Sequence, residues 1–145
     1  MNDEGPVTVG VLSLHSSKET KAILNAVSDL GHEPVWLREE NTAVSIDGGE
    51  PTLEPDVDVI ANRLLLTNTE QPAEGLGLAN VFCGLRPMLN PPAAQLTAIH
   101  KFATATKLAG AGVRVPDSLL ALSADRLNED RGRFGDSAVY KTAIG

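Results

Sequence analysis

The sequence predicts an α/β protein, with an open, mostly parallel sheet in residues 1–89 followed by a second, α+β unit in residues 90–145. Residues 7–14 form an uncharged, β-branched run, as in parallel strands that are covered on both faces. Strand patterns then alternate with helical patterns up to residue 89, which is typical of an open α/β sheet. Asn90-Pro91-Pro92 begins a new helical pattern, because Asn can cap a helix and Pro is tolerated at its first position.

In the first unit, Ser16 and Glu19 have the spacing of a capping box, and the helix that they predict ends at Gly31. A hairpin is predicted where Asp47-Gly48-Gly49-Glu50 lies between two short β-patterns. The other predicted elements are strands at residues 34–37, 57–61 and 86–89 and a helix at residues 73–85.

The second unit is predicted to begin with one helix that is capped by Asn90, runs to about residue 111 and is ended by Gly110 and Gly112. Lys101 lies at the border between the apolar and polar faces of this helix. A strand at residues 113–116, a short helix capped by Ser123 and a strand at residues 137–144 are expected to follow.

Composition excludes several classes of partner. The chain has 12 Lys and Arg residues and 19 Asp and Glu residues, a net charge of −7, which disfavours direct binding of nucleic acid. Cys83 is the one cysteine, so no internal disulfide can form, as is usual in a reducing cytosol. No apolar run approaches the roughly 18 residues of a membrane span. The sequence therefore predicts a cytoplasmic protein with no nucleic-acid or membrane partner.

The loop after the first predicted strand, residues 13–17, contains no glycine. Dinucleotide-binding and P-loop proteins both need glycines there, because the backbone must come close to the phosphates. Neither class is therefore expected. Open α/β sheets bind ligands at the carboxyl ends of their strands, where His15 and Arg63 are candidates for contacting a substrate carboxylate. The alternatives are a hydrogen-bonded surface histidine and a salt-bridged arginine.

Lys101 and Lys141 are candidate nucleotide contacts, since a lysine offers phosphates a mobile charge on a long stem. In a strand at residues 137–144, Lys141 shares a face with Val139 and Ala143, so its stem emerges among small apolar residues that suit a nucleotide slot. The alternatives are a helix-border lysine whose stem covers apolar surface, and an edge-strand lysine that discourages sheet pairing.

From Asn90 onward the sequence resembles the opening of an ATP-grasp domain, in particular that of RimK-type α-L-glutamate ligases. The resemblance lies in residues 89–118 (LNPPAAQLTAIHKFATATKLAGAGVRVPDS) and 138–145 (AVYKTAIG), at Asn90, Lys101, Gly112, Pro116 and Lys141. His100 departs from the pattern, because the family often has Asp there. The first unit resembles the family's N-terminal domain more loosely, so the resemblance covers almost the whole chain.

The resemblance implies a pre-ATP-grasp, Rossmann-like domain in residues 1–89 and an incomplete N-terminal lobe of an ATP-grasp domain in residues 90–145. It implies that ATP converts a carboxylate into an acyl phosphate, which an amine of an amino-acid or peptide substrate attacks. The magnesium ligands and the glycine-rich loop are expected in a C-terminal lobe beyond residue 145. No catalytic or metal-binding residue is therefore assigned here, and the chain alone is expected to be inactive.

A second hypothesis is a free-standing, non-catalytic α/β module that binds a small molecule or acts as a scaffold. It retains part of the ligase scaffold without the chemistry. The sequence does not decide between the two hypotheses, nor between a monomer and a homo-oligomer.

Overall fold

A computed structural model describes residues 5–65, 72–135 and 137–144. The chain divides into two compact units, Met1–Pro92 and Ala93–Gly145, and each is described by itself.

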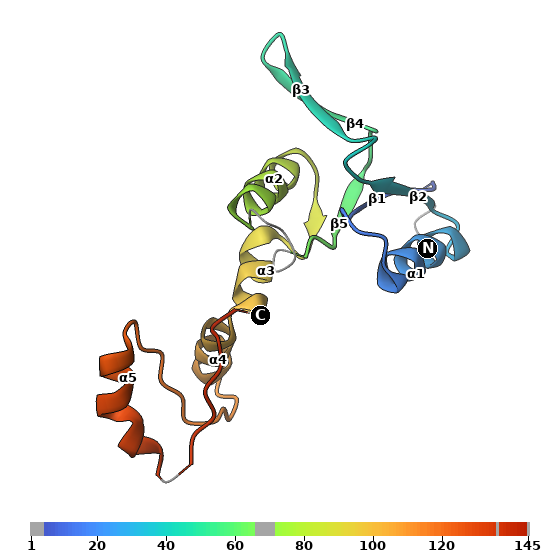
Figure 1. The fold of residues 1–145 in the computed structure, drawn as a ribbon. Coiled ribbons are helices and arrows are strands. Elements are labelled where there is room, and N and C mark those ends of the chain that lie inside the picture. The colour runs from blue at the N-terminus through green and yellow to red at the C-terminus, as the bar shows by residue number, and fades with distance from the viewer. Residues whose placement is uncertain (1–4, 66–71, 136, 145) are drawn as a thin grey trace. The chain divides into compact units, whose positions relative to one another are not determined.

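The first unit contains a four-stranded parallel sheet with the strand order β2-β1-β5-β6 (Figure 1). The predicted α/β fold is thus confirmed. The strands are β1 (Thr8–Leu12), β2 (Glu33–Leu37), β5 (Val59–Asn62) and β6 (Met88–Leu89), and the helices are α1 (Lys18–Asp29) and α2 (Pro72–Leu85). Helix α1 joins β1 to β2, and α2 joins β5 to β6 in the opposite direction along the sheet. Right-handed crossovers therefore place the two helices on opposite faces.

The strand order places a topological switch point between the ends of β1 and β5, which is the position of the ligand crevice in open α/β sheets. The chain leaves β1 towards one edge of the sheet and leaves β5 towards the other, so this is the point at which open α/β sheets bind ligands. The two strand ends are joined directly, because the Arg63 N–H donates to the Leu12 carbonyl at 2.9 Å.

The core of this unit forms around β1, whose Val11 and Leu12 are buried together with Leu37 and Ile60. Gly10 allows the close packing. A Cβ atom at this position would lie 2.7 Å from Leu37 Cδ1, closer than two carbon atoms can approach. The glycine in the predicted first strand is therefore a packing requirement.

Helix α1 begins one residue later than the predicted capping box. Ser17, not Ser16, is the N-cap, and its Oγ accepts from the Thr20 N–H at 3.0 Å. The buried Thr20 hydroxyl in turn donates to Ser13 Oγ at 3.2 Å, which ties the helix start to the end of β1. Gly31, with φ of 80°, ends the helix as predicted.

The predicted hairpin is confirmed as β3 (Ala43–Asp47) and β4 (Glu50–Glu54), which project from the sheet (Figure 1). Its two turn residues, Gly48 and Gly49, both have positive φ, 61° and 91°. This is the type I′ geometry, which matches the twist of the flanking strands and strongly favours glycine.

The second unit is built from helices. They are α3 (Pro92–Ile99, which begins at the unit boundary), α4 (Lys101–Gly110), α5 (Ala124–Asp130) and the 3₁₀ turn η1 (Arg131–Phe134). Gly112, with φ of 78°, closes α4 as predicted. The predicted strands at residues 113–116 and 137–144 are wrong: neither segment is a strand, and in the described residues their pairing is limited to one bridge between His100 and Ile144. A strand needs a neighbour, and the described part of this unit has none to offer.

The single helix predicted from the Asn90 cap to about residue 111 is also wrong, because it breaks at His100. The Lys101 N–H donates to the Ala143 carbonyl at 2.9 Å instead of to Thr97, four residues earlier. The Thr104 hydroxyl fills the gap by donating to the Thr97 carbonyl at 2.7 Å. The Lys101 N–H and the Thr97 carbonyl, which would bond to each other in an unbroken helix, therefore both have partners.

Candidate functional site

The helix break makes Lys101 the first residue of α4. His100 is the N-cap, with an extended backbone, and its Nδ1 accepts from the Ala103 N–H at 3.2 Å. The bond uses the lone pair of Nδ1, so in this geometry the ring nitrogen acts as a hydrogen-bond acceptor. Sequence reasoning missed this role, although a signal was present: the family that the sequence resembles often has Asp here, a preferred N-cap residue.

The structure brings together the two segments that carry the predicted lysines. The bond from Lys101 to the Ala143 carbonyl and the bridge between His100 and Ile144 fasten residues 143–144 to the start of α4. Lys141 lies two residues before Ala143, and both lysine side chains are exposed. Their joint contact with a nucleotide stays a proposal.

The start of α4 has a positive local charge. A helix N-terminus carries roughly half a positive charge from its aligned peptide dipoles. Lys101 adds a full positive charge at this end, and an anion bound there would interact favourably with both charges. The arrangement therefore suits a phosphate group.

His15 and Arg63 follow β1 and β5, on the two sides of the switch point. His15 is exposed, and its carbonyl accepts from the Ser13 hydroxyl at 2.9 Å. Arg63 is half-buried, and within the described residues its buried Nε has no hydrogen-bond partner. A buried guanidinium N–H without an acceptor is costly, so this atom is suited to an acceptor supplied by a ligand.

Glu19 in the first turn of α1 interacts with Arg63. Its carboxyl pKa is below the ordinary 4.5, chiefly because the Glu19 backbone N–H donates to the carboxylate and secondly because the Ser17 hydroxyl does, with a smaller contribution from the Arg63 charge. The resulting stabilisation is present above pH 4.5 and is lost as the pH falls through the lowered pKa.

Asn62 and Asn90 connect the ends of β5 and β6. The buried Asn62 donates from Nδ2 to the Asn90 carbonyl at 3.0 Å and accepts from the Leu64 N–H at 3.1 Å. Asn90 has φ of 61°, a left-handed conformation that asparagine tolerates. It is not the N-cap that the sequence suggested, since α3 begins two residues later, with Pro92 as its first residue.

No family model matches the sequence, and the curated proteins contain no match. Solved structures do match. A RimK domain protein ATP-grasp from Sphaerobacter thermophilus has a TM-score of 0.63 at 20% identity, over 88% of this chain and 46% of that chain. The ATP-grasp ligase PsnB has TM-scores of 0.59 and 0.60 in two structures at 15% and 16% identity, over 88% and 99% of this chain and 52% and 59% of those chains.

This chain shares the ATP-grasp fold. The predicted resemblance is thus confirmed at the level of the fold, and the chain spans about half the length of the solved chains that it matches. The two PsnB structures are complexes, one with a minimal precursor, Mg and ADP, and one with the precursor peptide PsnA2 and AMPPNP.

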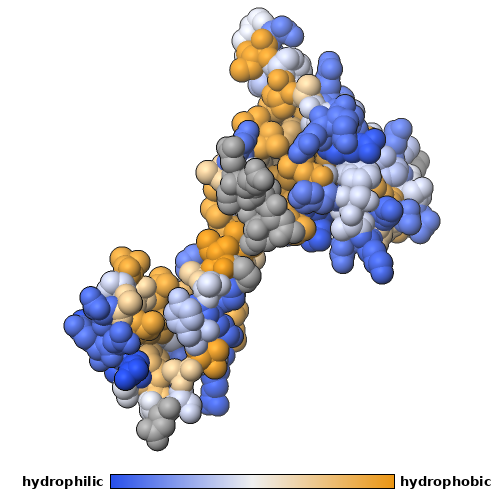
Figure 2. All heavy atoms as spheres, viewed as in Figure 1, coloured by the Kyte–Doolittle hydropathy of each residue, from blue (hydrophilic) through white to orange (hydrophobic). Residues whose placement is uncertain are grey.

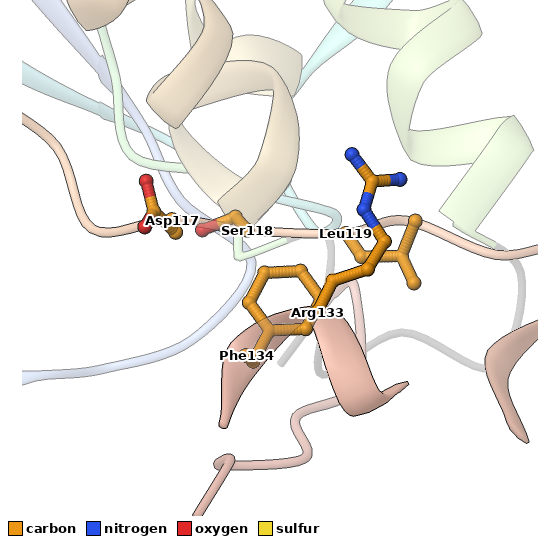
Figure 3. Close-up of a pocket in the computed structure, with 5 residues that line it drawn as sticks. All are labelled: Asp117, Ser118, Leu119, Arg133 and Phe134. Atoms are coloured by element: carbon orange, nitrogen blue, oxygen red, sulfur yellow. The ribbon is translucent and has the colours of Figure 1, made fainter. Parts of the chain in front are cut away.

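The second unit contains a pocket of about 250 Å³, whose lining residues are drawn in Figure 3. Its lining residues come from the irregular segment after α4 and from η1, and they are Asp117, Ser118, Leu119, Arg133 and Phe134. Neither Lys101 nor Lys141 lines it, so it is separate from the candidate phosphate site.

Among the described residues, no group of three His, Cys, Asp or Glu side chains is placed to hold a metal ion. In the same residues, no helix is both long enough and apolar enough to cross a membrane.

Proposed function

We propose that this chain is the N-terminal part of an ATP-dependent carboxylate-amine ligase of the RimK-like ATP-grasp class. Residues 1–89 form its pre-ATP-grasp domain, and residues 90–145 form the first part of its nucleotide lobe. Lys101 and Lys141 contact the phosphates of ATP. The complete cytoplasmic enzyme forms an acyl phosphate and joins it to an amine, with glutamate as the amino acid added.

One observation carries this proposal: within an ATP-grasp fold, a backbone hydrogen bond fastens the segment after Lys141 to the start of α4 at Lys101. The two positions that match the ligase pattern in sequence are far apart along the chain. Their segments nevertheless meet, and at a helix N-terminus, where an anion is stabilised.

The exposed apolar surface of the second unit supports a further lobe. None of the described residues from 93 onward is buried, and Leu122, Val139 and Tyr140 are 99%, 82% and 79% exposed. Several large apolar side chains exposed on one unit are normally covered by contact with another protein surface. We place the covering surface in the C-terminal lobe, together with the magnesium ligands and the glycine-rich loop.

Arg63 and His15 are proposed to contact the carboxylate of the amino-acid or peptide substrate. The support is their position on the two sides of the switch point of the sheet and the unpartnered Nε of Arg63 among the described groups. Magnesium accompanies ATP in the complete enzyme, as it accompanies ADP in one PsnB complex.

The test is calorimetric titration of the chain with ATP. Replacing Lys101 or Lys141 by Ala is expected to cost about 1–2 kcal/mol each, or roughly fivefold to thirtyfold in Kd, because each removes a charged contact to phosphate. Lys107→Ala is the matched control, since Lys107 is an exposed lysine in the last turn of the same helix.

Equal weak binding by all three variants would remove the assigned lysine roles. The chain alone is expected to show no ATP turnover. Magnesium-dependent ATP hydrolysis by the purified chain would contradict the proposal that catalysis requires the C-terminal lobe. A free-standing binding module could also bind ATP through these lysines, so ATP turnover in the presence of the further lobe is the result that distinguishes the ligase from the module.

A further inference from the structure

The hairpin β3–β4 has one apolar face and one acidic face. Cross-strand partners share a face, so the pairs Val44–Leu53 and Ile46–Pro51 form one side. Leu53 is buried at 3% exposure, whereas Val44 and Ile46 are 36% and 72% exposed. Hydrophobic surface therefore continues from the root of the hairpin towards its projecting tip, as Figure 2 shows.

The opposite face carries the polar pairs, with Ser45 Oγ and Thr52 Oγ1 in a 2.8 Å hydrogen bond. Asp47, Glu50 and Glu54 lie on this face, and the sequence from residue 43 to residue 54 contains no Lys, Arg or His. The acidic charge of the hairpin has no basic side chain of its own to neutralise it.

The backbone register decides which edge is open. The two-residue turn makes Asp47 and Glu50 a hydrogen-bonded pair, so pairs alternate from there and Val44 and Ile46 direct their N–H and C=O groups outward from β3. The outer edge of β4 is blocked at the equivalent place, because Pro51 has no N–H. Within the described part of the chain, no hydrogen bond reaches the hairpin backbone from outside it.

We propose that the outer edge of β3 binds an extended peptide in which apolar and basic residues alternate. Such a peptide adds a third strand. Its apolar side chains cover Val44 and Ile46, and its Lys or Arg side chains meet the acidic face. A second copy of this chain is a poorer occupant, because pairing two β3 edges brings the two acidic faces together and like charges repel.

The probe is a fluorescein-labelled peptide of alternating valine and lysine, about eight residues long, measured by fluorescence anisotropy with the 145-residue chain at about 0.05 M salt. Saturable binding is expected. A valine-glutamate peptide and a valine-lysine peptide with prolines at alternate positions are expected to bind at least about tenfold more weakly, through charge repulsion and loss of backbone donors respectively.

Two variants separate edge pairing from general attraction to an acidic protein. Ile46→Pro removes an outward N–H and leaves the β3–β4 bonds intact, so it is expected to abolish saturable binding. Asp47→Lys is expected to weaken binding about fivefold or more. Glu74→Lys in α2 makes the same change in net charge and is expected to weaken binding less than about twofold.

Equal weakening by Asp47→Lys and Glu74→Lys would overturn the proposal, as would full binding by Ile46→Pro. If circular dichroism shows that Ile46→Pro does not fold, Ile46→Thr is the deciding variant, because threonine keeps the strand and loses most of the apolar contact. Unchanged affinity of Ile46→Thr for the valine-lysine peptide would then contradict the proposal. A dimer in sedimentation velocity that Ile46→Pro dissociates would show that a second copy occupies the edge, and would also overturn it. The hairpin has no part in the proposed nucleotide contacts, so either proposal can fail without the other.

Discussion

Among single residues, Gly10 sets how closely the side chains of Leu37 and Val57 approach β1. A Cβ atom at Gly10 would lie 2.7 Å from Leu37 and 3.1 Å from Val57, both of which are buried. Gly10→Ala is therefore expected to destabilise the chain by about 1–3 kcal/mol, as overpacking does in well-packed cores. Urea unfolding measures the change.

Gly77→Ala is the matched control, because a Cβ at Gly77 meets nothing within 4 Å and the residue lies inside α2. This variant is expected to stabilise the chain by about 0.5–1 kcal/mol, since alanine loses less conformational freedom in a helix than glycine does. Destabilisation of similar size at both positions would rule out the packing explanation for Gly10.

Candidate site residues could be chosen from the sequence, whereas the partners of individual residues could not. Lys101, Lys141, His15 and Arg63 could be chosen from their charge and their place in the pattern. That His100 caps a helix could not be read from periodicity, because histidine is an uncommon cap and the helical pattern continues through it. The Asn90 contact with Asn62 depends on two strand ends meeting in space.

At the scale of elements, the start of α4 depends on the His100 cap. His100→Ala leaves the Ala103 N–H without its acceptor and is expected to cost about 0.5–2 kcal/mol. His100→Asp is expected to cost nothing or to stabilise, because a carboxylate is a better cap and carries a charge that the helix N-terminus favours. Thermal unfolding followed by circular dichroism compares the three proteins.

Equal losses in the Ala and Asp variants would show that the imidazole contributes by packing and not by capping. The comparison also bears on the ligase resemblance, because the family that the sequence resembles often has Asp at this position.

Most elements of the first unit followed from local sequence, and those of the second followed less well. The hairpin, α1 and α2 each have their own turn or end signals, such as Gly48-Gly49 and Gly31. The break between α3 and α4 requires the Ala143 carbonyl, which lies far along the chain and is invisible to a local pattern. The predicted strand at residues 137–144 is wrong for a related reason. Within the described chain, this segment pairs only through the bridge between Ile144 and His100, so it has no neighbouring strand.

At the scale of the whole molecule, the buried core lies in the first unit. The buried apolar residues run from Val11 to Phe82, and none of the described residues beyond 92 is buried. Local unfolding is easiest where few apolar contacts hold the chain. Limited trypsin digestion is therefore expected to cut after Arg114, in the segment without regular structure, before it cuts within the first 90 residues.

Lys21 is an internal control for this digestion, because it is exposed but lies within α1. Mass spectrometry of early fragments identifies the first cut. Cleavage at Lys21 as early as at Arg114 would mean that the two units are equally resistant, and would argue against a second unit that needs a further lobe.

The helix break also has a consequence for the order of assembly during synthesis. A growing chain that has not yet reached Ala143 offers no acceptor for the Lys101 N–H, whereas Thr97 is already in place. The continuous helix that local sequence favours is then the expected nascent structure. Synthesis of the segment that contains Ala143 exchanges one backbone partner for another, so Lys101 reaches its final setting only after residue 143 has been added.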